Sequence, residues 1–194
     1  MEAIITSEDI RALKPRFSVN IQDAQIVNQM IIDAQRFDVR PILGEAFYYE
    51  VYTAANVSPV VSPYTELLNG TTYTNSNGLT VQFYGLKVAI VDYAFARSLE
   101  NINLYFTRAG AKYKNTDTSE RINNSELASW VNSARSQAIA YMNDVNEYLT
   151  VNKADFPTWV SDCQDPTGRS VKSYASQKSS TNFRPSKFYT SKKY

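Results

Sequence analysis

The chain has 194 residues, of which 43% are apolar and 13% aromatic. That is enough apolar surface to offset chain entropy, so wholesale disorder is excluded and one domain with an appendage is expected. Histidine is absent and Cys163 is the single cysteine. These two facts exclude histidine-based catalysis, an intrachain disulfide and a cysteine-rich zinc site.

Charge is distributed unevenly along the chain. Residues 1–165 contain 13 Lys/Arg and all 19 Asp/Glu, a net charge of −6, whereas residues 166–194 contain seven basic residues, seven serines and no acid. A segment of that composition cannot bury a core of its own. We therefore predict a helical domain over residues 1–164 and a basic, extended C-terminal arm over residues 165–194.

Helical periodicity dominates the first part of the chain. Thr6, followed by an acid at Asp9, is typical of a helix N-cap, and Pro15 ends that short helix. Apolar residues spaced by three and four predict a second helix over about residues 20–38. Pro41 fits the first turn of a third helix. A break at Val39-Arg40 would join the second and third helices as a helical hairpin.

The chain next contains a loop with Pro59 and Pro63, followed by a short helix that ends at Gly70. After this helix, apolar residues occur at every second position. Between residues 71 and 84, Leu79, Val81 and Phe83 alternate with polar residues, and Asn77-Gly78 favours a tight primed turn. Two strands alone are marginally stable in water, so the predicted β-hairpin must lie on a helix or pair with another chain. We assign Leu79, Val81 and Phe83 to this interface.

Two long helices complete the predicted fold. Residues 85–106 are apolar nearly all round, which is typical of a central helix. Asn123 begins the longest amphipathic helix, which extends for about 26 residues to near Leu149. The fold class is mainly α: a small helical bundle with one β-hairpin and an extended C-terminal arm.

The strongest candidates for catalysis are Asp92, Arg97 and Glu100, because ionisable groups on a buried helix can have tuned pKa values. Structural salt bridges explain them better, since the spacing of Arg97 and Glu100 is routine for helix ion pairs. Carboxylate clusters at metal-ligand spacing and phosphate-binding glycine loops are missing from the sequence. We therefore expect no catalytic residue, no metal and no cofactor, and a chain that is not an enzyme.

Membrane insertion and secretion are not expected either. The first residues lack the basic and apolar regions of a signal peptide. The longest clearly apolar run, Val88–Val91, stops at Asp92 and is too short to span a bilayer.

The basic arm mixes positive charge with aromatic rings, which act as anchors when a segment docks on another protein. The predicted docking residues are Arg169, Lys172, Tyr174, Lys178, Phe183, Arg184, Lys187, Phe188, Tyr189, Lys192, Lys193 and Tyr194. Nucleic-acid binding, by stacking and phosphate neutralisation, and a flexible solubilising tail are the alternatives. We favour docking on a protein.

Four segments resemble the head-tail connector (adaptor) proteins of tailed bacteriophages, as found in crAss-like and other phages of Bacteroidota. They are Ile5–Ile10, Ala34–Gly44, Thr107–Lys112 and the pair Tyr148–Thr150 with Phe156–Trp159. Their order and spacing over about residues 1–160 carry the resemblance, and none is a catalytic signature. The basic arm lies outside the matching segments.

The resemblance implies a structural virion protein that forms a ring of twelve copies at the neck, below the portal. Its partners would be neighbouring copies, the portal protein and the next tail or ring protein, with genomic DNA passing through without sequence-specific binding. Its location would be the head-tail junction of the virion, and the host cytoplasm during assembly. The alternative function is a phage DNA-binding accessory protein that acts through the basic arm.

Overall fold

The computed structural model describes residues 3–15, 24–101, 104–107, 110–113 and 123–160, and the chain is mainly helical, as predicted. The helical elements are α1 (Ser7–Leu13), α2 (Ala24–Ala34), the π-helical turn η1 (Gln35–Val39), α3 (Arg40–Leu43), α4 (Glu45–Ala55), α5 (Tyr64–Asn69), α6 (Leu86–Asn101) and α7 (Asn124–Val151). The strands are β1 (Thr71–Thr74), β2 (Thr80–Phe83), β3 (Leu104–Thr107) and β4 (Gly110–Tyr113).

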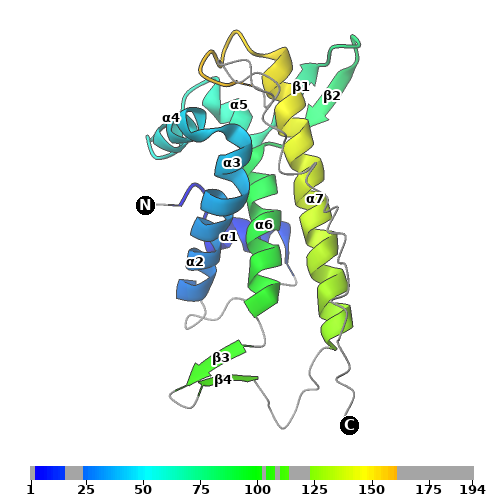
Figure 1. Ribbon diagram of the computed structural model, residues 1–194. Coiled ribbons are helices and arrows are strands. Elements are labelled where there is room, and N and C mark those ends of the chain that lie inside the picture. The colour runs from blue at the N-terminus through cyan, green and yellow to red at the C-terminus, as the bar shows by residue number, and fades with distance from the viewer. Residues whose placement is uncertain (1–2, 16–23, 102–103, 108–109, 114–122, 161–194) are drawn as a thin grey trace, which may run out of the picture. The chain divides into compact units, whose positions relative to one another are not determined.

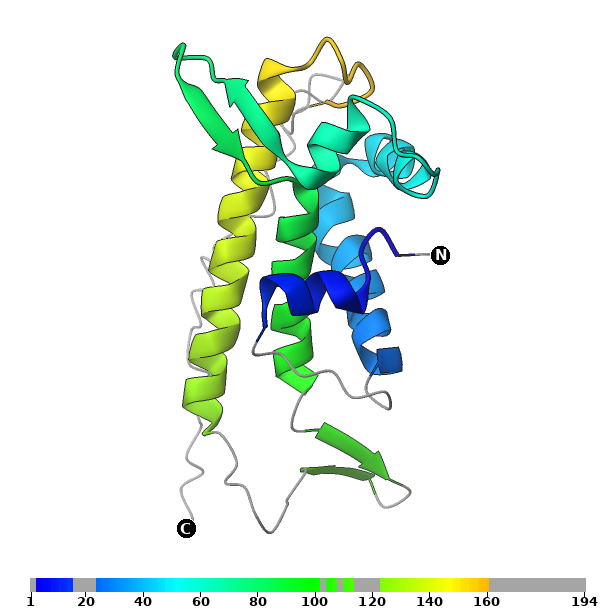
Figure 2. The ribbon, with the colours of Figure 1, turned by 180° about the vertical axis from the view of Figure 1, so that it is seen from behind.

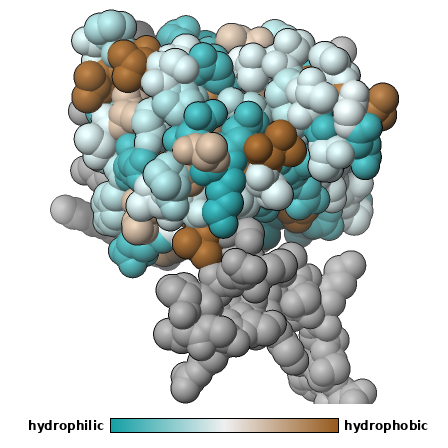
Figure 3. Space-filling view, turned by 90° about the horizontal axis from the view of Figure 1, so that it is seen from above, coloured by the Kyte–Doolittle hydropathy of each residue, from teal (hydrophilic) through white to brown (hydrophobic). Residues whose placement is uncertain are grey.

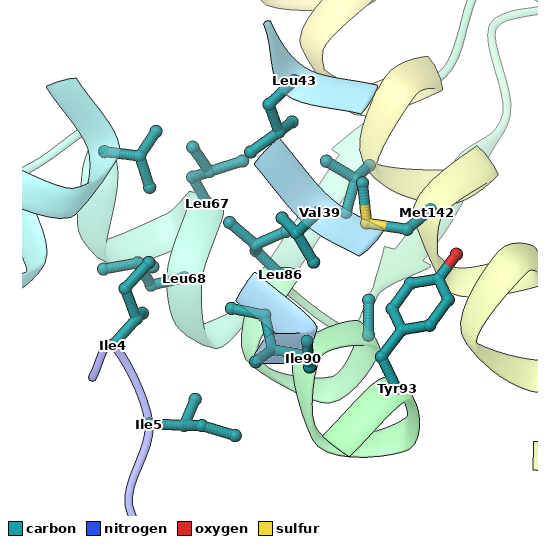
Figure 4. Close-up of a cluster of buried hydrophobic side chains, with 14 of the residues drawn as sticks. Ile4, Ile5, Val39, Leu43, Leu67, Leu68, Leu86, Ile90, Tyr93 and Met142 are labelled. Carbon is teal, nitrogen blue, oxygen red and sulfur yellow. The ribbon is translucent and has the colours of Figure 1, made fainter. Parts of the chain in front are cut away.

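Helix α6 is the centre of the bundle, which confirms the prediction for its apolar sequence. Helices α2 and α7 pack along it and α1 crosses it (Figures 1 and 2). Leu86 and Ile90 of α6 are fully buried. Figure 4 shows them surrounded by side chains from the N-terminal segment, the α2–α3 helix, α5 and α7. The hydrophobic core therefore packs the long helices against one central helix, α6.

The N-terminal segment contains a capped helix and is attached to the bundle by a buried hydrogen bond. Thr6 and Asp9 form the predicted capping box, in which the Thr6 N–H donates to Asp9 Oδ2 at 2.7 Å. The Ile4 N–H donates to Gln35 Oε1 at 2.7 Å. Because Gln35 is itself fully buried, this bond satisfies its amide oxygen inside the core.

The predicted break at Val39-Arg40 is wrong. The helix continues through η1, where the Arg40 N–H donates to the Gln35 carbonyl, and it ends at Gly44, whose φ is 79°. Proline has no N–H to donate to the preceding turn, so a wider π turn ahead of Pro41 accommodates it without ending the helix. The change of direction falls one turn later, at the glycine.

The predicted helix over residues 85–106 is too long. Helix α6 ends at Asn101, and β3 pairs with β4 in an antiparallel ladder from Leu104↔Tyr113 to Thr107↔Gly110. The aromatic and β-branched residues at the end of the predicted helix favour a strand over a helix. The described chain thus contains a second two-stranded ladder besides the predicted hairpin.

Helix α7 matches the predicted long helix closely. It has 28 residues, and the Asn123 side chain caps it by accepting from the Ser125 N–H at 3.2 Å. Trp130 of this helix is 52% exposed, whereas Met142 is buried. Over the described residues, no helix has the length and apolar character to cross a membrane.

The chain divides into one unit of residues 1–161 and a second of residues 162–194. The second unit, and with it the predicted arm, lies outside the described residues. The predicted boundary between residues 164 and 165 stays a prediction.

The predicted hairpin is formed by β1 and β2, in register from Thr71↔Phe83 to Thr74↔Thr80. Its turn differs from the prediction, because the loop runs from Asn75 to Leu79 and the Asn75 side chain accepts hydrogen bonds from the N–H groups of Asn77 and Leu79. Among the described residues, positive φ is confined to glycines, so Asn77 is not in the left-handed conformation that a primed turn needs.

Two glycines hold the base of the hairpin together at close backbone contact. Gly70 and Gly85 have φ values of 91° and 88°. A Cβ on Gly70 would lie 2.4 Å from the Phe83 carbonyl oxygen, and one on Gly85 would lie 2.6 Å from the Gly70 nitrogen. Any side chain here would force the two ends of the hairpin apart.

We predict that Gly70→Ala destabilises the protein much more than Gly78→Ala. Both glycines have positive φ, but nothing lies within 4 Å of a Cβ at Gly78. In the Gly78 variant, the free energy of unfolding should fall only by the conformational cost of a side chain at positive φ, about 1–2 kcal/mol. In the Gly70 variant it should fall by at least about 2 kcal/mol more, because the new side chain overpacks the contact. Chemical denaturation of both variants measures the difference. Equal losses would show that the close contact at Gly70 is not a constraint.

Candidate interaction surface

The hairpin is fixed to the bundle by three aromatic rings. Phe83 stacks on Tyr148 of α7 with ring centroids 4.4 Å apart and planes 8° apart. Tyr73 of β1 meets the same Tyr148 edge to face at 5.2 Å. Because Phe83 is only 1% exposed, the base of the hairpin is part of the core and packs directly on α7.

Phe156 extends this aromatic cluster to two further helices. Its ring lies 6.2 Å from Tyr148, 5.8 Å from Phe47 of α4 and 5.8 Å from Tyr64 of α5. Glu50 of α4 accepts hydrogen bonds from the Tyr64 hydroxyl and from the Thr158 hydroxyl. Burial, together with the hydrogen bond to Glu50, raises the pKa of Tyr64 to about 12. The segment that follows α7 is thus tied to the same end of the bundle as the hairpin.

The predicted interface residues Leu79, Val81 and Phe83 lie on one face of the hairpin, and we call them the hairpin row. Phe83 is buried, Val81 is half-buried and Leu79 is 62% exposed. The opposite face is exposed and polar, and consists of Thr72, Thr74, Thr80 and Gln82. The apolar row therefore continues from the buried base toward the exposed tip of the hairpin. The hairpin itself projects away from α7 (Figure 2).

Four carboxylates lie close enough to Tyr73 or Tyr148 at the hairpin base to act on the pKa of these tyrosines, and we call Glu66, Asp144, Glu147 and Asp155 the acidic rim. Burial raises the pKa of Tyr73, and the negative charges of Glu147 and Asp144 raise it further. The pKa of Tyr148 is raised by burial and then by Glu66 and Asp155. Among the described residues, no member of the rim forms an ion pair.

The structure does not bring Asp92, Arg97 and Glu100 together into one site. The Arg97 guanidinium donates to both oxygens of Asp38, at 2.6 and 3.0 Å. Glu100 pairs with Arg135 of α7 at 2.5 Å. The expected pairing of Arg97 with Glu100 is therefore wrong, because each finds a partner on another helix. These ion pairs connect α6 to η1 and α7, as a structural role requires.

Asp92 forms the most deeply buried of these ion pairs. Lys14, which follows α1, places its Nζ 2.6 Å from Asp92 Oδ1, and the Asp92 side chain is 1% exposed. The same ammonium group lies 3.3 Å from Gln137 Oε1 of α7. Burial raises the pKa of Asp92, and the charge of Lys14 partly opposes the shift. Lys14 thus links α1, α6 and α7.

Metal-binding clusters of three or more suitable side chains do not occur within the part of the chain that the structure describes. The end of the bundle that carries the hairpin shows single apolar side chains separated by polar ones (Figure 3). The twelve predicted docking residues of the arm, from Arg169 to Tyr194, lie outside the described residues.

The amphipathic pattern of the long helix does not identify Tyr148 as the partner of the hairpin. One signal was available: Tyr141 and Tyr148 are two turns apart, and they contact Tyr84 and Phe83, which are consecutive. The acidic rim was missed, because its members come from α5, α7 and the segment after α7. Only Asp144 and Glu147, three residues apart on α7, are related by a helical spacing.

The fold defines a mainly helical protein with a projecting hairpin. Residues 39–169, which are more than half of the chain, match a family described as "Family of unknown function (DUF6712)". The chain belongs to this family. No curated protein and no solved structure matches it.

We predict that side-chain truncation lowers stability strongly at the buried end of the hairpin row and very little at its exposed end. Phe83→Ala should destabilise the protein by about 3–5 kcal/mol, because it removes a fully buried ring. Leu79→Ala should change stability by less than about 0.5 kcal/mol, because the side chain is mostly exposed. Urea denaturation of the two variants tests this. A large loss for Leu79→Ala would mean that the tip of the row is covered within the chain's own fold.

We also predict that Asp92 makes stability depend on pH. The pKa of Asp92 in the folded state is raised above its ordinary value of 3.8. The folded state therefore holds this proton more tightly than the unfolded state. The resulting stabilisation is present below that ordinary value and is lost as the pH rises through the raised pKa.

The measurement is the free energy of unfolding of the wild type minus that of Asp92→Asn, between pH 4 and 7. The difference should fall as the pH rises. A difference that grows with pH would mean that the ion pair with Lys14 outweighs the burial of the carboxylate.

Proposed function

We propose that the protein is a structural virion protein that forms a ring at the head-tail junction, below the portal. The resemblance to head-tail connector proteins motivates this proposal. The observation that carries it is the hairpin row, which begins in the core at Phe83 and ends at Leu79, 62% exposed at the tip. An apolar row on a projecting hairpin is suited to contact a neighbouring copy, as a ring requires.

The rigidity of the hairpin base supports the same role. The Phe83–Tyr148 stack and the close contact at Gly70 fix the direction in which the row projects. A ring needs identical contacts at identical angles between successive copies, because the rotation must close. An element fixed to α7 meets this need better than a flexible loop.

The negative charge of the domain supports a ring through which DNA passes without being bound. The net charge of −6 over residues 1–165 would weakly repel a polyanion in a channel. The basic arm, which extends from the acidic domain in sequence, would attach each copy to the portal. Twelve attachments would reinforce one another through effective concentration.

The alternative is a DNA-binding accessory protein that acts through the arm. The observation that favours it is the composition of residues 166–194, with seven basic residues and no acid. Such a protein would bind DNA with a steep dependence on salt, and the binding would be lost when these residues are removed.

The proposal is tested by mass photometry of the full-length chain and of a 1–165 truncation, each with and without the cognate portal. We expect the full-length chain to join the portal as a ring and the truncation to bind more weakly. A chain that stays monomeric with the portal and shifts only on DNA would overturn the proposal in favour of the alternative.

A matched pair of variants tests the part played by the hairpin row. Leu79→Asp should abolish or weaken ring formation, whereas Thr80→Asp, next to it on the polar face, should leave the ring intact. Both positions are exposed, so neither variant should unfold the chain. Equal effects of the two variants would exclude the row as the contact.

A further inference from the structure

The outer flank of α2 and η1 carries a second row of apolar side chains besides the hairpin row. Phe37 is 59% exposed and Ile26 is 53% exposed, and Met30 lies between them in the sequence, half-buried. Spacings of four and seven residues put these three side chains on one flank of the helix. We call Ile26, Met30 and Phe37 the α2 stripe. A second apolar surface thus runs along this side of the bundle.

The aromatic end of the stripe has a fixed position. Arg97 of α6 places its guanidinium carbon 5.7 Å from the centre of the Phe37 ring, and the same guanidinium donates to both oxygens of Asp38. The ring therefore lies on an ion pair that joins η1 to α6, although more than half of it is exposed. An aromatic side chain held in this way loses little conformational freedom when a partner covers it, which suits an interface anchor.

Cations flank the α2 stripe, whereas acids flank the hairpin row. Arg36 precedes Phe37 and forms no ion pair with the described residues. Arg40, about one turn further along, lies 3.9 Å from Glu45 Oε1, which is the longest ion-pair distance in the described part of the chain. The stripe and the hairpin row are therefore both apolar, and the charges beside them are opposite in sign.

Two members of the acidic rim lie beside the hairpin row. Asp144 and Glu147 raise the pKa of Tyr73, which is directly across the hairpin ladder from Val81. Both acids are exposed. Burial raises the pKa of Asp144, and the negative charge of Glu147 raises it further. A cation brought to this place would relieve the repulsion between these two like charges.

The α2 stripe and the hairpin row lie on opposite sides of the bundle. Helix α2 packs on one side of α6 and α7 packs on the other, and the hairpin projects from the α7 side (Figures 1 and 2). Because α6 lies between them, the row and the stripe cannot contact each other within one chain. Between copies, complementary surfaces on opposite sides form a head-to-tail contact, which generates a ring when the rotation closes.

We propose that the hairpin row of one copy docks on the α2 stripe of a second copy. Leu79 of the row contacts Phe37 of the stripe, and the cations of η1 and α3 face Asp144 and Glu147. This inference rests on the proposed ring, because it names the surface of the neighbouring copy that receives the row. Each copy uses both of its surfaces, one toward each neighbour.

The test is photocrosslinking of the full-length chain, with benzoylphenylalanine in place of Phe37, in the presence of the cognate portal. Equal amounts of unlabelled and nitrogen-15-labelled protein are mixed, so that crosslinked peptides with one label identify contacts between copies. We expect such mixed crosslinks from position 37 to residues 79–81. Tyr49 of α4 is another exposed aromatic residue. The same probe at position 49 is the matched control and should not reach residues 79–81.

The outcomes separate this contact from the proposed function. A ring on the portal, seen by mass photometry, without mixed crosslinks from position 37 to the hairpin would overturn the contact and leave the ring. Mixed crosslinks without a ring would overturn the ring and leave the contact between copies. Absence of both would overturn both. Equal crosslinking to the hairpin from positions 37 and 49 would also overturn the proposed contact.

Charge reversal tests the electrostatic part of the contact. Arg36→Glu should raise the concentration at which half of the chains are in rings by about fivefold, because attraction to the acidic rim becomes repulsion. Adding Glu147→Arg should restore assembly, since opposite charges again face each other. Glu126→Arg is the matched control: it changes the net charge equally but lies about 30 Å from Glu147 along α7, and it should not restore assembly. Equal rescue by both, or no effect of Arg36→Glu, would exclude this charge pairing.

Discussion

The stack of Phe83 on Tyr148 is the contact on which the arrangement of the hairpin end depends. A two-stranded ladder is marginally stable alone, and here its last residue is inserted into the core against the longest helix. Phe156 packs against the same tyrosine and brings α4, α5 and the segment after α7 to the same place. One aromatic cluster therefore brings together the hairpin row, α4, α5 and the segment after α7.

The middle of the bundle depends on a different kind of contact. Ion pairs connect α6 to its neighbours: Lys14–Asp92 links it to α1, Arg97–Asp38 to η1, and Arg135–Glu100 to α7. Asp92 is buried, so desolvation offsets its attraction to Lys14. The Arg135–Glu100 pair is exposed, where an ion pair contributes little to stability. The charged groups of α6 thus connect it to the neighbouring helices.

Sequence patterns correctly predicted the parts of the fold that depend on contacts between residues close together in the chain. Four features follow from side chains within a few residues of one another: the Thr6 cap, the short helix that ends at Gly70, the hairpin strands and the start of α7 at Asn123. The errors arose where two local signals compete. Pro41 favours the first turn of a new helix, but a π turn accommodates it within the continuing helix. The apolar run after Asn101 fits a helix, but its aromatic and β-branched residues also suit a strand, which is what the chain forms there.

The candidate surface was only partly predictable, because it depends on residues that are far apart in the sequence. The alternation of Leu79, Val81 and Phe83 identified one face of the hairpin, but not where α7 stops covering it. That limit depends on the position of Tyr148, about 65 residues further along the chain. The acidic rim is assembled from three separate segments, so only the tertiary structure brings its charges together.

A double-mutant cycle on Phe83→Leu and Tyr148→Leu tests the central claim most directly, since it isolates the coupling between the two rings in the free energy of unfolding. The stacked geometry predicts a coupling of about 1 kcal/mol beyond the loss of buried area. A coupling of zero within error would mean that the two rings pack independently. The hairpin would then not be fixed to α7 by this contact.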